Sequence, residues 1–258
     1  MKIVVLIKEV PDTWGERRLS LETGLVERAA SASVLDEIDE RAVEAALAFA
    51  DAHPGTEVAV VAMAPASAVA TIRKALAMGA TSALHVVDDA LRGADLLLTA
   101  EVLAAAIRRV GFGLVIAGNL STDGGGGVIP AMVAELLDAP QLTGLSTLEI
   151  TDDAVSGDRV SDAGTMHVSA PLPAVVSITE AMPEGRFTTF KGIMAAKKKP
   201  FETVDAGDLG IAPEDAATAR YIMLSVAERP PRQAGTKIVD EGDAGEKLAA
   251  FLLAEGVA

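Results

Sequence analysis

The residues best suited to chemistry lie in the stretch LVIAGNLSTDGGGGVIPAMVAELL, residues 114–137. Its apolar start predicts a strand over Leu114–Gly118, and the later apolar residues recur with helical period from about Gly127. The four consecutive glycines at 124–127 can adopt positive φ and present bare backbone N–H groups to a ligand. Pro130 is tolerated in the first turn of the helix, whose N-terminus adds partial positive charge. The stretch predicts an anion site, with phosphate the favoured anion; the alternative is a flexible surface turn.

Few side chains near the glycines could act as acids, bases or metal ligands. Asp123 is the one candidate carboxylate, and capping of the loop is the commoner role for such a residue. No Lys-Ser or Lys-Thr pair follows the glycines, the loop lies too late in the chain for a dinucleotide fingerprint, and no SGGxDS stretch of the ATP pyrophosphatases occurs. The chain has no cysteine, and its three histidines, His53, His85 and His167, are far apart in the sequence. We therefore expect ligand binding without a catalytic residue and without a metal.

Composition limits the fold and the partners. A chain of 258 residues that is 50% hydrophobic can bury one large core, alone or with a small appendage, so one or two domains are expected. The formal net charge of −15 argues against nucleic acid as a partner. The apolar run before Lys8 is too short for a signal peptide or a membrane span, so we expect a cytoplasmic protein without membrane insertion. With 3% aromatic residues, the chain would hold a cofactor largely through backbone and small residues.

Alternating strands and helices precede and position the glycine loop. Strands are predicted at Lys2–Ile7, Glu57–Met63, Ala83–Val87 and Leu114–Gly118, and helices at Asp36–Ala52, Ala66–Met78 and Ala94–Val110. This alternation predicts an α/β fold with right-handed crossovers and a doubly wound, mostly parallel sheet. Residues 9–33 lack a sustained period and are expected to form an excursion or a small hairpin. Trp14 in this excursion is expected to pack beneath the loop; the alternative is that it faces a partner or a cofactor.

The pattern changes after Pro140. Short β-type runs occur at Thr147–Ile150, Arg159–Ser161, Met166–Val168 and Ala174–Ile178, and they predict a hairpin or meander added to the sheet. A cationic loop or short helix is expected at Arg186–Pro200. We assign residues 1–200 to one domain and residues 201–258 to an extended acidic tail with a last helix at Ala244–Glu255. The tail has little core of its own and is expected to lie on the domain or on a partner.

Ligands of open α/β sheets bind at the carboxyl ends of the strands, near the switch point of the strand order. If Lys2–Ile7 and Leu114–Gly118 are neighbours, their following loops and the helix N-terminus at Asp36 meet in one pocket. A nucleotide there would place its phosphate on the backbone of 124–129. Its base would then contact apolar residues at the strand ends, namely Leu6, Ile38 and Met63.

For two groups of charged residues, an ordinary structural role is the alternative to binding a ligand or a partner. Asp36 and Asp39 fit the N-cap and first-turn charges of a helix, which is the commoner role for such residues. The lysines at 197–199 fit a solvated charge run. These lysines also follow apolar residues that could form an exposed docking tip with basic flanks, namely Phe187, Phe190, Ile193 and Met194.

Several stretches together resemble the β subunit of electron transfer flavoproteins over almost the whole chain. They are VLIKEVPD, DEIDERAVEAAL, RKALAMGATSALHV, AGNLSTDGGGGVIPAMVAELL, LPAVVSITEAMPEGRFTTFKGIMAAKKKP and AERPPRQAGTKI. The motifs LAMGA, LPAVV and the IMxAKKK-like run, in this order, are specific to that family. The resemblance implies an adenine-nucleotide α-hydrolase-like variant of the Rossmann fold.

The resemblance also implies a function in electron transport, as in fatty acid oxidation. The chain would form a heterodimer with an α subunit that carries the redox-active FAD, and would itself bind AMP as a structural nucleotide. The complex would accept electrons from acyl-CoA dehydrogenases and similar flavoprotein dehydrogenases and pass them to the respiratory chain through ETF-quinone oxidoreductase. This chain would then be an electron-carrier subunit without bond-making chemistry of its own.

Site residues follow from the same resemblance. Thr13 and Trp14 would approach the flavin, residues 184–200 would form a recognition loop around Phe190, and the tail 201–258 would pack on the partner subunit. The AMP contacts fall at the matching positions Leu6, Asp36, Glu37, Ile38, Asp39, Met63, Gly118, Asn119, Leu120, Ser121, Thr122, Asp123, Gly124, Gly125, Gly126, Gly127, Val128 and Ile129.

The sequence departs from the family pattern at three places. Asp36-Glu37 replaces the usual Asn-Pro, Phe190 replaces the recognition-loop leucine, and 127–129 are Gly-Val-Ile where many members have polar side chains. Some members with an electron-bifurcating function bind a second FAD in this subunit instead of AMP. A stand-alone nucleotide-binding module like the universal stress proteins is a further alternative. A nucleotide-hydrolysing enzyme is disfavoured by the missing base and metal ligands.

Overall fold

The computed structural model describes residues 1–213, 221, 223–232 and 235–256. The chain divides into two compact units, Met1–Leu224 and Ser225–Ala258. The first unit contains the sheet and the glycine loop. The second unit contains the helix α6 (Ala244–Ala254), in which no residue is buried.

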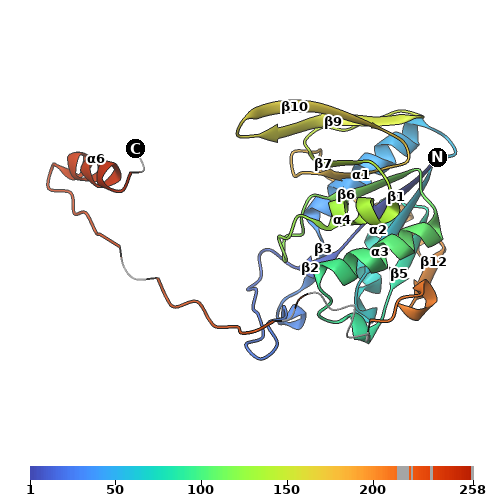
Figure 1. The fold of residues 1–258 in the computed structure, drawn as a ribbon, viewed down its shortest axis with the longest axis horizontal. Coiled ribbons are helices and arrows are strands. Elements are labelled where there is room, and N and C mark those ends of the chain that lie inside the picture. The colour runs from blue at the N-terminus through green and yellow to red at the C-terminus, as the bar shows by residue number, and fades with distance from the viewer. Residues whose placement is uncertain (214–220, 222, 233–234, 257–258) are drawn as a thin grey trace. The chain divides into compact units, whose positions relative to one another are not determined.

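A ten-stranded sheet runs through the first unit in the order β10-β9-β7-β11-β6-β1-β4-β5-β12, with β8 paired to β9 (Figure 1). Seven strands are linked by parallel pairings: β1 (Lys2–Leu6), β4 (Glu57–Met63), β5 (Ser82–Val86), β6 (Leu114–Gly118), β7 (Gln141–Leu145), β11 (Ala174–Ile178) and β12 (Phe201–Val204). Three strands join by antiparallel pairings: β8 (Glu149–Ile150), β9 (Ala154–Ser161) and β10 (Gly164–Pro171). The predicted hairpin added to a mostly parallel sheet is confirmed.

Helices cover both faces of the sheet, which confirms the doubly wound α/β fold. One face packs against α1 (Glu37–Ala52) and α2 (Val69–Met78), with Ile3 and Val5 of β1 in the shared core. The other face packs against α3 (Leu96–Val110) and α4 (Ile129–Leu137), with Val4 and Leu6 of β1 in that core. Alternate residues of β1 therefore enter opposite cores, as expected for a strand buried on both faces.

The switch point of the strand order lies between β1 and β6. From β1 the chain builds β4 and β5 on one side, then returns through α3 to add β6 on the other side of β1. The two strands pair in parallel register, with Ile3 opposite Leu114 and Val5 opposite Ile116. Their carboxyl ends lie side by side, so the condition for a shared ligand pocket is met.

The excursion leaves the sheet directly after β1. Its two ends pair as a short antiparallel ladder, β2 (Glu9–Pro11) with β3 (Ser33–Leu35). It also contains the 3-10 turn η1 (Arg28–Ala30). The predicted small hairpin is therefore confirmed for the two ends of this segment.

Some boundaries differ from the sequence-based prediction. The strands β7 and β12 are absent from it, and β9 and β10 are longer than the predicted runs. Because β12 pairs with β5, residues 201–204 belong to the sheet and not to a tail that begins at 201. The remaining short 3-10 turns are η2 (Ala66–Ala68), η3 (Asp89–Leu91) and η4 (Gly207–Leu209). No helix among the described residues is long and apolar enough to cross a membrane.

Candidate functional site

A carboxylate on α1 joins the ends of β1 and β6. Asp39 is 8% exposed and accepts hydrogen bonds from the backbone N–H groups of Lys8 (2.8 Å) and Gly118 (3.2 Å). Only glycine fits at 118, because a Cβ there would lie 2.7 Å from Asp39 Oδ1. Burial raises the pKa of Asp39 well above its ordinary value, and the neighbouring charge of Asp36 raises it further. Asp39 thus holds the two strand ends together across the switch point.

Asp36 connects the start of α1 to the loop after β6. Its Oδ1 accepts from the backbone N–H of Ile38 at 3.1 Å, so it is the N-cap of α1. Its Oδ2 accepts from the N–H and the hydroxyl of Thr122, at 2.8 and 3.0 Å. Asp36 is fully buried, whereas the neighbouring Glu37 is exposed. The N-cap interpretation of Asp36 is correct, and the side chain also fixes the loop that carries the glycines.

Asp123 is buried within the loop and paired with two cations. Its side chain is 2% exposed and lies 2.7 Å from Lys8 Nζ and 3.1 Å from Arg28 Nη2. It also accepts from the N–H of Gly124 at 2.6 Å, which is the predicted capping of the loop. Burial alone would raise the pKa of Asp123, but hydrogen bonds from Lys8 and Ser121 and the charges of Lys8 and Arg28 hold it below its ordinary value. Asp123 is therefore a charged structural group.

The glycine loop presents a run of N–H groups without a protein acceptor. Gly125 and Gly127 have φ of +61° and +67°, a left-handed backbone conformation that glycine adopts readily. In the described part of the chain, the N–H groups of Gly126–Ile129 donate to no acceptor. The N-cap of α4 is Val128, whose side chain cannot cap the helix, and the buried Oδ1 of Asn119 also has no partner. Unpaired donors at an uncapped helix N-terminus fit a phosphate group, and Asn119 offers an acceptor to a ligand donor.

The apolar strand-end residues do not form one surface. Leu6 and Ile38 are 6% and 5% exposed, and their side chains belong to the cores on opposite faces of the sheet. Met63 is partly buried at the end of β4. Of these three residues, Met63 is the one whose side chain remains in part available to a base. Contact of these three residues with a base stays a prediction.

The excursion leaves its tryptophan in solvent. Trp14 is 97% exposed, and Thr13 beside it is exposed as well. Its backbone N–H donates to Oδ1 of Asp12 at 3.0 Å, which fixes the local turn. The prediction that Trp14 packs beneath the loop is therefore wrong for this chain, and an exposed position facing a partner or cofactor is the alternative that stays open.

An apolar surface projects from the segment predicted to dock partners. It comprises Phe187, Phe190, Ile193 and Met194, which are 94%, 81%, 45% and 47% exposed. Phe190 begins the helix α5 (Phe190–Ala196), whose N-cap Thr189 accepts from the N–H of Gly192 at 3.0 Å. The expected exposed apolar tip is confirmed, and its residues lie on and beside one capped helix.

The helix α5 is held against α2 by backbone contacts. Arg73 donates to the carbonyl of Ala196 at 2.9 Å, and Lys199 donates to the carbonyl of Leu76 at 2.8 Å. A Cβ at Gly192 would lie 2.4 Å from the carbonyl oxygen of Ala77, so glycine permits this close packing. Lys199 is thus partly buried and bonded, which corrects its assignment to a solvated charge run.

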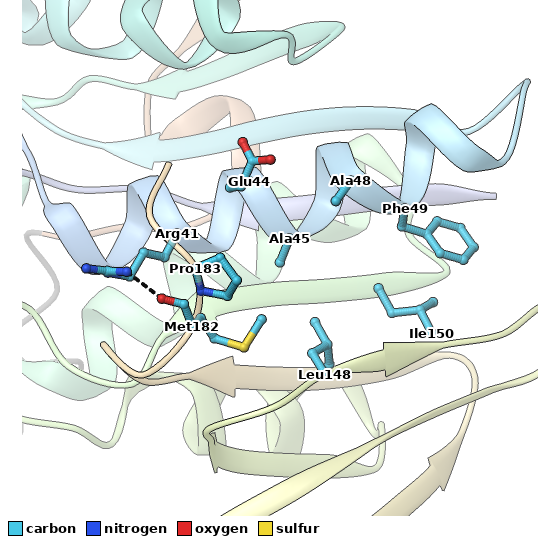
Figure 2. A pocket seen from close by; sticks show the side chains of 9 residues that line it. All are labelled: Arg41, Glu44, Ala45, Ala48, Phe49, Leu148, Ile150, Met182 and Pro183. Carbon is cyan, nitrogen blue, oxygen red and sulfur yellow. Dashed lines mark hydrogen bonds between the residues drawn. The ribbon is translucent and has the colours of Figure 1, made fainter. Parts of the chain in front are cut away.

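A separate hollow of about 330 Å³ lies between α1 and the segments that carry Leu148, Ile150 and Met182 (Figure 2). Figure 2 shows Ala45, Ala48 and Phe49 of α1 facing Leu148 and Ile150. The remaining lining residues are Arg41, Glu44, Met182 and Pro183. Its charged rim is already bonded, since Arg41 donates to the carbonyl of Met182 and Glu44 pairs with Arg186. The hollow shares no lining residue with the strand-end site.

The buried carboxylates at the strand ends and the glycine loop serve the structure of the site. Asp36, Asp39 and Asp123 are each committed to backbone or cation partners. Among the residues that the structure describes, no cluster of three or more His, Asp or Glu side chains could hold a metal ion. The sequence does not predict Lys8 and Arg28 as site residues, because no local motif marks them. Their role is visible only in the folded chain, where both lie beside Asp123.

Comparisons with known proteins give a consistent result. The family model described as "Electron transfer flavoprotein domain" matches residues 23–209. Over 99% of its length the chain is 45% identical to a protein named "Electron transfer flavoprotein subunit beta" from Mycobacterium leprae, 98% of which is covered. It is 32% identical to the protein of that name from Bacillus subtilis, with 96% and 94% of the two chains covered. It is also 32% identical to "Caffeyl-CoA reductase-Etf complex subunit CarD" from Acetobacterium woodii, with 93% and 92% covered.

Proposed function

Because the chain belongs to the electron transfer flavoprotein β subunits, we propose that it binds a structural nucleotide and docks redox partners within a heterodimer. The observation that carries the nucleotide assignment is the run of unpaired N–H groups at Gly126–Ile129. These donors and the N-terminus of α4 would hold the phosphate of AMP. Asn119 and Met63 would contact the rest of the nucleotide, and the backbone at the end of β1 would lie beside it.

The nucleotide in this chain has a structural role in the proposal. Asp36, Asp39 and Asp123 are all bonded within the protein, so none of these three buried carboxylates is left as a base for attack on a phosphate. FAD carried by an α subunit supplies the redox chemistry when it is bound. This chain then braces the α subunit, with Thr13 and Trp14 exposed on the side proposed to approach the flavin and the second unit packed on the partner.

The exposed apolar surface at α5 is the proposed docking site for electron donors. The exposed Phe190, flanked by Lys191 and by the exposed Lys197 and Lys198, is suited to an apolar pocket with an acidic rim. The donors would be acyl-CoA dehydrogenases and similar flavoprotein dehydrogenases, and electrons would pass through ETF-quinone oxidoreductase to the respiratory chain. We place the complex in the cytoplasm.

The proposal is tested by making the complex and removing one anchor. Co-expression with the α subunit of the same organism should give a yellow complex, whereas this chain alone should be colourless. Phe190→Ala in that complex should slow its reduction by an acyl-CoA dehydrogenase at least tenfold, about the effect of losing a docking anchor of 1.4 kcal/mol, with FAD content unchanged.

The control is Met166→Ala on β10, which also removes an exposed apolar side chain, 60% exposed, and should leave the rate unchanged. Equal rates for wild type and Phe190→Ala would reject the docking role of α5. A yellow chain without the α subunit would favour the alternative with a second FAD in this subunit.

A further inference from the structure

The glycine loop is tied to the excursion at two points along the chain. On the limb next to Trp14, the guanidinium of Arg17 donates to the carbonyl of Thr122. On the returning limb, Arg28 Nη2 lies 3.1 Å from Asp123 Oδ2, and its Nη1 donates to the carbonyl of Glu9 at 3.1 Å. Both arginines therefore link the excursion to consecutive residues that come directly before the glycines.

Asp123 lies at the centre of these contacts. Its other cation partner, Lys8, follows β1 and is fixed to the sheet because its own N–H donates to Asp39 at 2.8 Å. With the carboxylate only 2% exposed, these charge interactions are poorly screened by solvent. Asp123 is thus bonded to the rigid sheet on one side and to the excursion on the other.

The excursion is otherwise held by its own backbone bonds, including a bridge between Leu19 and Val26, and by Leu25 close to Gly93. None of the residues from 12 to 31 whose burial is described is buried, and the segment is attached at its base through β2 and β3. Its conformation therefore depends in part on the polar contacts that Arg17 and Arg28 make with the glycine loop. A loop of four glycines loses much conformational entropy when it is ordered, so a ligand that orders the loop changes the constraint on everything bonded to it.

We propose that Asp123 is a positioning residue that couples the glycine loop to the excursion, so that a nucleotide held at 126–129 sets the conformation of the segment carrying Trp14. The coupling rests on the nucleotide site proposed above. It gives the structural nucleotide a second consequence: occupancy of the loop controls the presentation of an exposed aromatic residue on a different segment. Thermodynamic linkage requires the reverse effect as well, so immobilising the excursion strengthens nucleotide binding.

The sequence supplies its own reporter for this coupling, because Trp14 is its single tryptophan. AMP is titrated into the full-length chain after nucleotide has been removed by dialysis. Trp14 emission and its quenching by acrylamide are followed, and binding is measured in parallel by calorimetry. In the wild type, the Trp14 signal should change and saturate together with the calorimetric binding curve.

Arg28→Gln removes the excursion side of the contact and leaves the loop sequence intact. AMP affinity should stay within about fivefold of the wild type, the range of a partly exposed ion pair. The Trp14 response should fall by more than half. Arg28→Lys, which keeps the charge, should restore most of the response. The control is Arg109→Gln, which breaks an exposed ion pair between Arg109 of α3 and Glu202 of β12 and should behave like the wild type.

Three results would overturn the coupling. Calorimetric binding of AMP without any change at Trp14 would reject it while leaving the nucleotide site in place. An unchanged response in Arg28→Gln would reject the route through Asp123. Absence of AMP binding to the wild-type chain would reject the nucleotide site and the coupling with it.

Discussion

Gly118 at the end of β6 and Gly127 of the glycine loop have separate roles that follow from their geometry. Gly127 has φ of +67°, a region that side chains with a Cβ rarely adopt, and it precedes Val128 at the start of α4. Gly118 has ordinary backbone angles but lies against the Asp39 carboxylate. The left-handed angle of Gly127 therefore shapes the loop that carries the unpaired amides. The missing Cβ of Gly118 permits Asp39 to bond the ends of β1 and β6.

Substitution of Gly127 by alanine should weaken AMP binding. The left-handed backbone angle costs about 1–2 kcal/mol with a Cβ present, so the loop relaxes and turns its amides away from the phosphate. We expect at least about a tenfold loss of affinity by calorimetry. Gly111→Ala is the matched control, since Gly111 has φ of +76° with no atom near its Cβ and follows α3 at the opposite end of β6. If both variants bind AMP like the wild type, the glycine loop is not the phosphate site.

His85 on β5 is a buried base in the first unit. Its ring is 1% exposed, its Nε2 lies 3.0 Å from the carbonyl of Ala64, and its Nδ1 has no partner. Phe201 packs against it edge to face, with ring centroids 6.0 Å apart. Burial lowers the pKa of His85 below its ordinary value, and the contact with Ala64 and the charge of Glu9 oppose this only in part.

The lowered pKa of His85 makes stability depend on pH with a definite sign. The unfolded chain takes up a proton near pH 6.5 and the folded chain only at lower pH. Stability from the neutral ring is therefore complete above about pH 6.5 and is lost as the pH falls toward the folded pKa, with a slope of up to about 1.4 kcal/mol per pH unit.

Urea unfolding of wild type and His85→Gln from about pH 7.5 to about pH 5.5 measures this dependence. Glutamine can still donate to Ala64 but cannot titrate, so its unfolding free energy should fall less over this range than that of the wild type. Parallel curves for the two proteins would show that His85 does not titrate differently on folding.

Among the elements, α5 illustrates how a short helix becomes a rigid platform. Seven residues are too few for a stable isolated helix, so its geometry must come from tertiary contacts. The Thr189 cap, the two cations on backbone carbonyls and the close approach at Gly192 provide them. The exposed apolar residues are therefore presented from a fixed surface.

Gly192→Ala should displace α5 without altering any exposed side chain. Its new Cβ would meet the backbone oxygen of Ala77 at 2.4 Å, which cannot yield as a flexible side chain would. We expect a loss of about 1–3 kcal/mol in unfolding free energy and slower reduction of the complex by an acyl-CoA dehydrogenase. Gly245→Ala in α6, where no atom lies within 4 Å, should leave the unfolding free energy unchanged or slightly higher. Equal stabilities and rates for the two variants would contradict the proposed seating of α5.

The elements that could be predicted are those with local signals. Apolar runs and helical periodicity identify β1, β4, β6 and α1, and the glycine run marks the loop between β6 and α4. The missed strands β7 and β12 are short and depend on partners far away in the chain, β11 and β5. Gly144 within β7, at φ of +70°, further obscures a strand pattern.

The candidate site, like the fold, could be predicted only where a local motif marks it. Local motifs located the loop and the start of α1, whereas the pairing of Asp123 with Lys8 and Arg28 depends on tertiary structure that no motif encodes. The prediction that Trp14 is buried was wrong because it rests on the usual burial of tryptophan side chains against apolar residues. Here the excursion is held in part by arginine contacts to the glycine loop. None of its residues from 12 to 31 whose burial is described is buried.

At the scale of the whole molecule, a nucleotide-type fold is combined with the means to hold other proteins. The sheet and its two cores lie in one compact unit around a site whose buried carboxylates Asp36, Asp39 and Asp123 are bonded within the protein. The exposed apolar residues at α5, the exposed Trp14 and an α6 without a buried residue are unusual for a protein that acts alone. This favours a subunit that binds a nucleotide for support and carries electrons only together with a partner.

The most direct test of that claim is the identity of the bound nucleotide. The chain is purified alone and with its α subunit, denatured, and its small-molecule contents are measured by mass spectrometry. The account predicts AMP in equimolar amount in both preparations, with FAD appearing only when the α subunit is present. Release of FAD from the chain alone, or of no nucleotide from either preparation, would contradict it.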